Sequence, residues 1–168
     1  MLSESARVTT AEEYKFRIQY PNSKPRAVKV IALDSHSAAL VDQLSKLKWN
    51  GAVFFSSLSF DAGDPAKGEL KGWLNDIAGC TMDLLSEVAS ADSVVIISTA
   101  GEDARVANVI SDACKANHKN LVGLIVPRPE TDDEHISISL NHLRPCTTML
   151  VLGGGIDYIE AMLTALRA

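Results

Sequence analysis

The chain has 168 residues, of which 46% are hydrophobic and 22% charged, the size and composition of a single soluble globular domain. Its formal net charge of −5 argues against a nucleic-acid-binding surface spread over the whole protein, so we predict no nucleic-acid partner. No apolar run approaches the roughly 20 residues of a membrane-spanning helix, and the first residues lack the apolar core of a secretion signal. We therefore expect a cytoplasmic protein without a membrane partner.

The cysteines argue against a disulfide framework and a compact zinc site. Cys80, Cys114 and Cys146 lie far apart, and no two of them have the C-x-x-C spacing. Free cysteine is among the most buried residue types. We expect buried free thiols in a reducing compartment.

The first predicted element is a strand ahead of the main domain. In residues 14–20 (YKFRIQY) hydrophobic side chains alternate with polar ones, the period of a half-buried strand. A turn-forming stretch, PNSKP, follows it. We expect residues 1–26 to be an N-terminal arm or edge strand, which forms a hairpin with the next strand or packs on another subunit.

Residues 27–168 are predicted to form a single Rossmann-like domain, because short apolar strands there alternate with amphipathic helices. We expect strands at 27–33, 51–56, 93–98, 121–127 and 147–152, and helices at 38–49, 69–89, 103–117, 131–143 and 156–167. Continuous apolar strands are buried on both faces, and strand–helix alternation implies parallel pairing through right-handed crossovers. The expected fold is α/β and doubly wound, a mostly parallel five-stranded sheet within a three-layer α/β/α sandwich.

In such a fold ligands bind at the carboxyl edge, where the parallel strands end. The loop after the first strand, residues 34–39 (DSHSAA), has no glycine, whereas a dinucleotide fingerprint needs G-x-G-x-x-G so that the backbone can approach a pyrophosphate. Asp34 or Ser35 is expected to cap the next helix. His36 could titrate near neutral pH. All three are candidate ligand contacts.

Small polar groups follow the next two strands. Ser56 ends the second strand, and Thr99 and Gly101 follow the third, so a hydroxyl or a backbone N–H could contact a ligand there. Glu102 and Asp103 are expected to complement a helix dipole, although such a carboxylate pair can also hold Mg²⁺. We predict ligand contacts at Ser56, Thr99 and Gly101 and no metal site.

Arg128 is the strongest single candidate for holding an anion. It follows the fourth strand between two prolines, which restrict the backbone that carries the guanidinium. The competing interpretation, which we favour, is a salt bridge to Glu130, Asp132 or Asp133.

Three glycines, Gly153, Gly154 and Gly155, join the last strand to the last helix. Glycine permits positive φ and close approach, and a helix N-terminus attracts anions. The P-loop lysine is missing, however, and Asp157 is expected to occupy the helix N-terminus. A tight strand-to-helix corner is therefore favoured over a phosphate cradle, and the three glycines remain candidate contacts.

Three segments together resemble the GTPase domain of the FtsZ/tubulin-like family. They are VKVIALDSHSAALVDQLSK, ASADSVVIISTAG and LVGLIVPRPETDDEHISISLNHLRPCTTMLVLGGG, and their order and rough spacing agree over about residues 27–155. The family's first loop is rich in glycine, and its GGGTGTG loop would follow Gly101, where this chain continues EDARVAN. The resemblance implies a degenerate relative that lacks the glycine-rich phosphate loops.

Two functions follow from these patterns. The first is a non-catalytic Rossmann-like module acting through homo-oligomerisation or a protein partner. The alternative is a small-molecule or nucleotide-binding protein that uses Gly101, Arg128 and residues 153–155 at the carboxyl edge. An enzyme with Asp34 and His36 as acid–base groups ranks last, because no spacing specifies a reaction, and no cofactor is identified.

Overall fold

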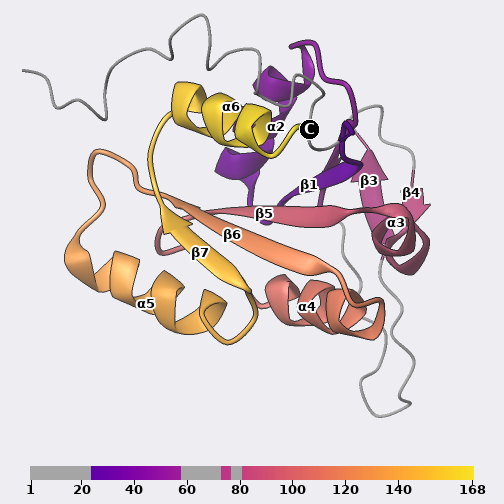
Figure 1. Ribbon diagram of the computed structural model, residues 1–168. Helices are drawn as coiled ribbons and strands as arrows, with labels where there is room; N and C mark the ends of the chain where they lie inside the picture. The colour runs from indigo at the N-terminus through magenta and orange to yellow at the C-terminus, as the bar shows by residue number, and fades with distance from the viewer. Residues whose placement is uncertain (1–23, 58–72, 77–80) are drawn as a thin grey trace, which may run out of the picture.

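The computed structural model describes residues 24–57, 73–76 and 81–168 (Figure 1). Its strands are β1 (Val28–Ala32), β2 (Ala52–Ser56), β3 (Trp73–Asp76), β4 (Thr81–Asp83), β5 (Ser93–Thr99), β6 (Asn120–Val126) and β7 (Met149–Leu152). Its helices are α2 (Ser35–Ser45), α3 (Leu84–Ser90), α4 (Val106–Ala116), α5 (Asp133–Leu143) and α6 (Ile156–Ala165).

The strands form one seven-stranded sheet with the order β4-β3-β2-β1-β5-β6-β7. β1 pairs in parallel with both β2 and β5, and β6 and β7 continue the parallel pairing outward. The chain leaves β1 toward β2 and later returns to β5 on the other side, which puts the switch point of strand order between β1 and β5. Helices α2 and α6 cover one face and α4 and α5 the other (Figure 1), so the α/β, Rossmann-like prediction is confirmed.

The predicted helix over residues 69–89 is wrong for residues 73–76 and 81–83. β3 pairs antiparallel with β2, and β4 pairs antiparallel with β3, so the sheet has two more strands than expected and is mixed. Trp73 and Thr81 are residue types that favour strands. Only the last part of the predicted helix forms, as α3, where the Asp83 side chain accepts a hydrogen bond from Ser86 N at 3.0 Å.

β1 has no open edge, because β2 and β5 pair with it along all five of its residues. A hairpin between β1 and residues 14–20 therefore has no place in this sheet. The predicted strand at residues 14–20 itself lies outside the described residues.

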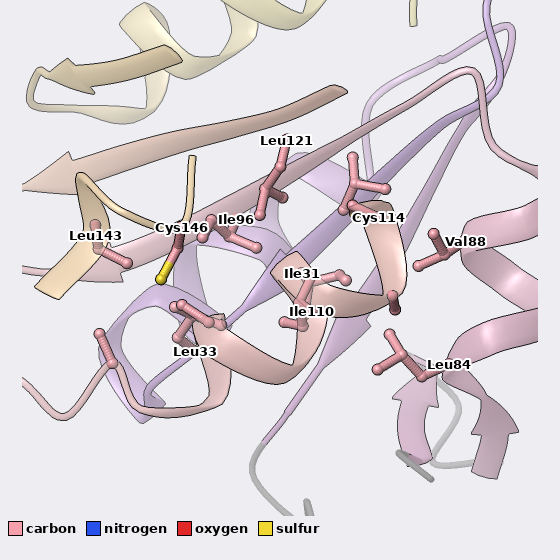
Figure 2. Packing of buried hydrophobic residues seen from close by; sticks show 14 of the residues in the cluster. Ile31, Leu33, Leu84, Val88, Ile96, Ile110, Cys114, Leu121, Leu143 and Cys146 are labelled. Atoms are coloured by element: carbon pink, nitrogen blue, oxygen red, sulfur yellow. The ribbon is translucent and has the colours of Figure 1, made fainter. Parts of the chain in front are cut away.

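The central strands are buried on both faces, as their continuous apolar sequences predict. All residues of β1 and β5 are buried, and alternate residues contribute to two separate clusters. Ile31 and Ile96 pack with Ile110 of α4 under one face (Figure 2). On the other face, Val30 of β1 belongs to a cluster that includes residues of α2 and α6. β1 and β5 are therefore packed on both faces, and the loops of the carboxyl edge follow directly from their ends.

None of the helices in the described ranges is long and apolar enough to cross a membrane.

Candidate functional site at the carboxyl edge of the sheet

The switch point between β1 and β5 is closed by the carboxylate of Asp34. This residue follows β1 and is only 8% exposed. Its Oδ1 accepts hydrogen bonds from Ser37 N at 2.9 Å and from Thr99 Oγ1 at 2.8 Å, and its Oδ2 accepts one from Thr99 N at 2.7 Å. Asp34 therefore ties the end of β1 to the end of β5 across the position where ligands bind in this architecture.

The same carboxylate caps α2, as the sequence predicts for Asp34. The Ser37 side chain completes a capping box, because its Oγ accepts a hydrogen bond from Asp34 N at 3.1 Å. A helix N-terminus attracts anions, and here the protein's own carboxylate fills that position. A phosphate at α2 would have to displace a carboxylate that already accepts three hydrogen bonds.

The other predicted contacts in these first two loops do not gather around Asp34. Ser35 and His36 are exposed in the first turn of α2, and Ser56 is half-buried at the end of β2. Ser57, the second small polar group that the sequence places at the end of this strand, is buried and donates a hydrogen bond from Oγ to Ala32 O at 2.8 Å. This bond links the ends of β1 and β2 and uses the hydroxyl within the protein.

The loop after β5 is held against α5. Gly101 N donates to Ser139 Oγ at 2.8 Å, and Ser139 is 1% exposed. Gly101 has a φ of +84°, and a Cβ there would lie 2.5 Å from His135 Cδ2. The N–H expected to face a ligand is therefore bonded to a helix. Ser139 lies 38 residues away in the sequence, so no local pattern could identify it.

Arg128 forms the salt bridge that the competing interpretation predicted, although with a different carboxylate. Its Nη2 lies 2.8 Å from Glu102 Oε1, and the two side chains are 31% and 42% exposed. Arg128 Nε is buried and has no hydrogen-bond partner. A small hollow of about 140 Å³ lies beside the pair, lined also by Thr131 and His135.

Asp103, Asp132 and Glu102, three acidic residues near this edge, each have a structural partner. Hydrogen bonds from the side chain and backbone of Arg105 hold the pKa of Asp103 below its usual value. The backbone N–H and the side chain of His135 likewise lower the pKa of Asp132, which caps α5. Glu102 is paired with Arg128, so it and Asp103 do not converge on one cation. No group of three potential metal ligands occurs among the residues that the structure describes.

The glycine corner meets two backbone requirements. Gly153 N donates to Ile125 O at 3.1 Å, and a Cβ on Gly153 would lie 2.7 Å from the Tyr158 ring. Gly155 is the N-cap of α6 with a φ of +87°, a conformation that other residues rarely adopt. Gly154 meets only ordinary contacts with Pro127. None of the three lines the hollow at Arg128.

No model of a known protein family matches the chain, and no curated protein matches it at a significant level. The relationship to the FtsZ/tubulin-like GTPase domain therefore stays a prediction.

Proposed function

We propose that this chain is a non-catalytic Rossmann-like module that acts by self-association along the outer edge of β7. The first support is the state of the carboxyl edge. At the switch point, the carboxylate of Asp34 accepts its hydrogen bonds from Thr99 and Ser37, and Gly101 N donates to Ser139. Catalysis and ligand binding need polar groups aimed at a substrate, and here the groups are aimed at one another.

The single observation that carries the proposal is the apolar surface at the lateral edge of the sheet formed by β7. β7 is an edge strand, since it pairs with β6 and with no other strand of the described chain. Several large hydrophobic side chains on β7 and its two flanking helices are exposed: Ile138 at 43%, Met149 at 48%, Leu152 at 49% and Tyr158 at 45%. We call these four residues the β7 patch. An exposed apolar edge strand is a surface that natural proteins normally cover.

Sedimentation velocity tests this proposal on the full chain. Wild-type protein is expected to sediment as a dimer or larger assembly at micromolar concentration. The Leu152→Glu variant should weaken association at least about tenfold, because a carboxylate would enter an apolar contact without a partner. The matched control is Leu47→Glu, at a leucine that is 40% exposed at the end of α2 and lies outside the β7 patch. Wild-type protein that remains monomeric would contradict self-association.

The buried Nε of Arg128 favours a second candidate function, the binding of a small oxyanion. Glu102 neutralises the guanidinium at Nη2, yet Nε keeps an unused donor beside the hollow. At about 140 Å³ the hollow is smaller than the roughly 300–1,000 Å³ of typical ligand sites, so phosphate fits the proposal better than a whole nucleotide.

Thermal unfolding with inorganic phosphate, GTP, GDP, ATP, NAD, FAD and coenzyme A, with and without Mg²⁺, tests this second function. A ligand at 100 times its dissociation constant stabilises by about 2.7 kcal/mol, a rise of a few degrees in Tm for this size. Arg128→Ala should abolish the rise, whereas Arg105→Ala, at an exposed arginine paired with Asp103, should preserve it. No rise with any of these ligands would remove the candidate.

A further inference from the structure

We infer that the strand that pairs with β7 is residues 14–20 of a second copy of this chain. The inference rests on the proposed self-association and names the segment that performs it. Two copies that exchange these segments would form a closed, two-fold symmetric dimer.

The outer edge of β7 has backbone donors for such a strand. Gly153 N donates to Ile125 O of β6 at 3.1 Å, and Ile125 is in register with Leu152, so the N–H just after β7 points toward β6. Because backbone groups alternate in direction along a strand, the N–H groups of Leu150 and Leu152 face away from β6. An added strand would bond to them, as in recognition by strand addition.

Residues 14–20 have the composition of that strand. Tyr14, Phe16, Ile18 and Tyr20 would lie on one face and Lys15, Arg17 and Gln19 on the other. Met149 and Leu152 point to opposite faces of β7, so the hydrophobic face of the added strand would lie beside Leu152 and the α5 side or beside Met149 and the α6 side. The segment contains no proline or glycine, either of which would weaken strand pairing.

The topology leaves residues 14–20 few places to pair. β1, the next strand along the chain, is paired on both sides, so a strand from the arm has to use an edge of a sheet. At the opposite edge, β4 has three residues, against four in β7. Among the described residues, Met82 on β4 is 37% exposed, whereas Met149 and Leu152 on β7 are 48% and 49% exposed.

The linker to the arm would have to be fully extended to reach the outer edge of the same copy's β7. Pro25 lines a hollow together with Lys48 and Ala168, and the next residue, Arg26, contacts Gly51 just before β2. A strand beyond β7 would lie four strand spacings from β1, about 19 Å, and β2 lies on the far side of β1. The five steps from Tyr20 to Pro25 span at most about 18 Å when fully extended. The arm of a second copy has no such limit.

The charges of the arm and of the helices that flank β7 are complementary. The arm segment carries Lys15 and Arg17 and no acidic residue. The helices that flank β7 both begin with exposed carboxylates, Asp133 in α5 and Asp157 in α6. The cationic face of an added strand would therefore lie near acidic helix ends on whichever side it faced, and the interaction should weaken with salt.

Thiol cross-linking between full-length copies tests the inference. One copy carries Ile18→Cys, and the other carries Met149→Cys and an affinity tag, both in a Cys80→Ser background in which the remaining native thiols, Cys114 and Cys146, are buried. After mixing, a short bismaleimide should join the two different copies, and mass spectrometry should identify the cross-link between positions 18 and 149. The matched control replaces Met149→Cys by Met82→Cys at the other sheet edge and should yield no cross-linked pair.

Three results would overturn the inference. Cross-linking of position 18 to position 82 as strongly as to position 149 would mean that the arm has no preference for β7. A double variant, Ile18→Cys with Met149→Cys, that forms only internal cross-links would put the arm on its own chain. Loss of association in Leu152→Glu without any cross-link to position 18 would leave the proposed self-association standing and remove the arm from it.

Discussion

The carboxyl edge between β1 and β5 and the outer edge of β7 differ in whether their polar and apolar groups have partners within the protein. At the first, the carboxylate of Asp34 accepts hydrogen bonds from Thr99 and Ser37, so these donors are used within the protein. At the second, backbone N–H groups and apolar side chains such as Leu152 face outward. The comparison teaches that the usual ligand position of a fold does not locate function in a particular chain. Exposed backbone donors and apolar side chains that have no partner within the described chain indicate better where a protein of this fold binds.

The largest expected effect comes from opening the carboxyl edge with Asp34→Ala. This variant removes the cap of α2 and leaves the buried Thr99 N–H without an acceptor. Loss of a cap costs about 1 kcal/mol and an unsatisfied buried donor about 1–3 kcal/mol, so we expect a total near 3 kcal/mol. Urea denaturation measures the free energy of unfolding.

The matched control is Asp83→Ala, which removes a cap of α3 that is exposed and forms no bond between strands. It should cost about 1 kcal/mol. If both variants lost the same stability, Asp34 would be an ordinary cap and the carboxyl edge would not be closed by it.

A pair of glycines provides an effect of comparable size. Gly101 and Gly155 both have positive φ, so alanine at either position should cost about 1–2 kcal/mol in backbone strain. At Gly101 the methyl group would also meet His135, whereas at Gly155 no atom lies within 4 Å. Overpacking adds typically 1–3 kcal/mol, so Gly101→Ala should be the more damaging. Equal thermal unfolding midpoints for Gly101→Ala and Gly155→Ala would contradict the close packing of the loop after β5 against α5.

The Arg128–Glu102 pair should contribute little. Both side chains are about a third exposed or more, and measured couplings of such pairs are about 0.2–1 kcal/mol. A double-mutant cycle with Arg128→Ala and Glu102→Ala measures the coupling directly. A coupling above about 2 kcal/mol would place this pair among buried, structurally essential contacts rather than at a partly open hollow.

The smallest expected effect is a pH dependence of the free energy of unfolding, caused by the buried thiol of Cys114 in α4. Burial raises the pKa of the Cys114 thiol to about 11, from an ordinary value of 9.0 (Figure 2). Between these two values the unfolded chain loses the proton and the folded chain keeps it, so the free energy of unfolding falls as pH rises. Cys114→Ala should lack this contribution. Urea titrations at pH 8, 9 and 10 compare the two proteins, and identical slopes against pH would contradict a buried thiol.

Local patterns predicted the parts of the fold that depend on local chemistry. Continuous apolar runs identified β1 and β5, and the position of Asp34 before an amphipathic stretch identified its cap. The error at residues 73–76 and 81–83 arose because β3 pairs with the edge of β2, a contact distant in sequence, and β4 pairs with β3. Non-local contacts likewise decide the partners of Arg128 and Gly101, since Glu102 and Ser139 lie 26 and 38 residues away. The β7 patch emerges only once the strand order is known.

Amide hydrogen exchange at several protein concentrations tests the contrast between the two edges most directly. The informative amides are those of Leu150 and Leu152, which face away from β6, and those of β5 serve as an internal reference. Self-association along β7 predicts that exchange at Leu150 and Leu152 slows as concentration rises, while exchange in β5 does not change. Exchange at Leu150 and Leu152 that is the same at every concentration would contradict it.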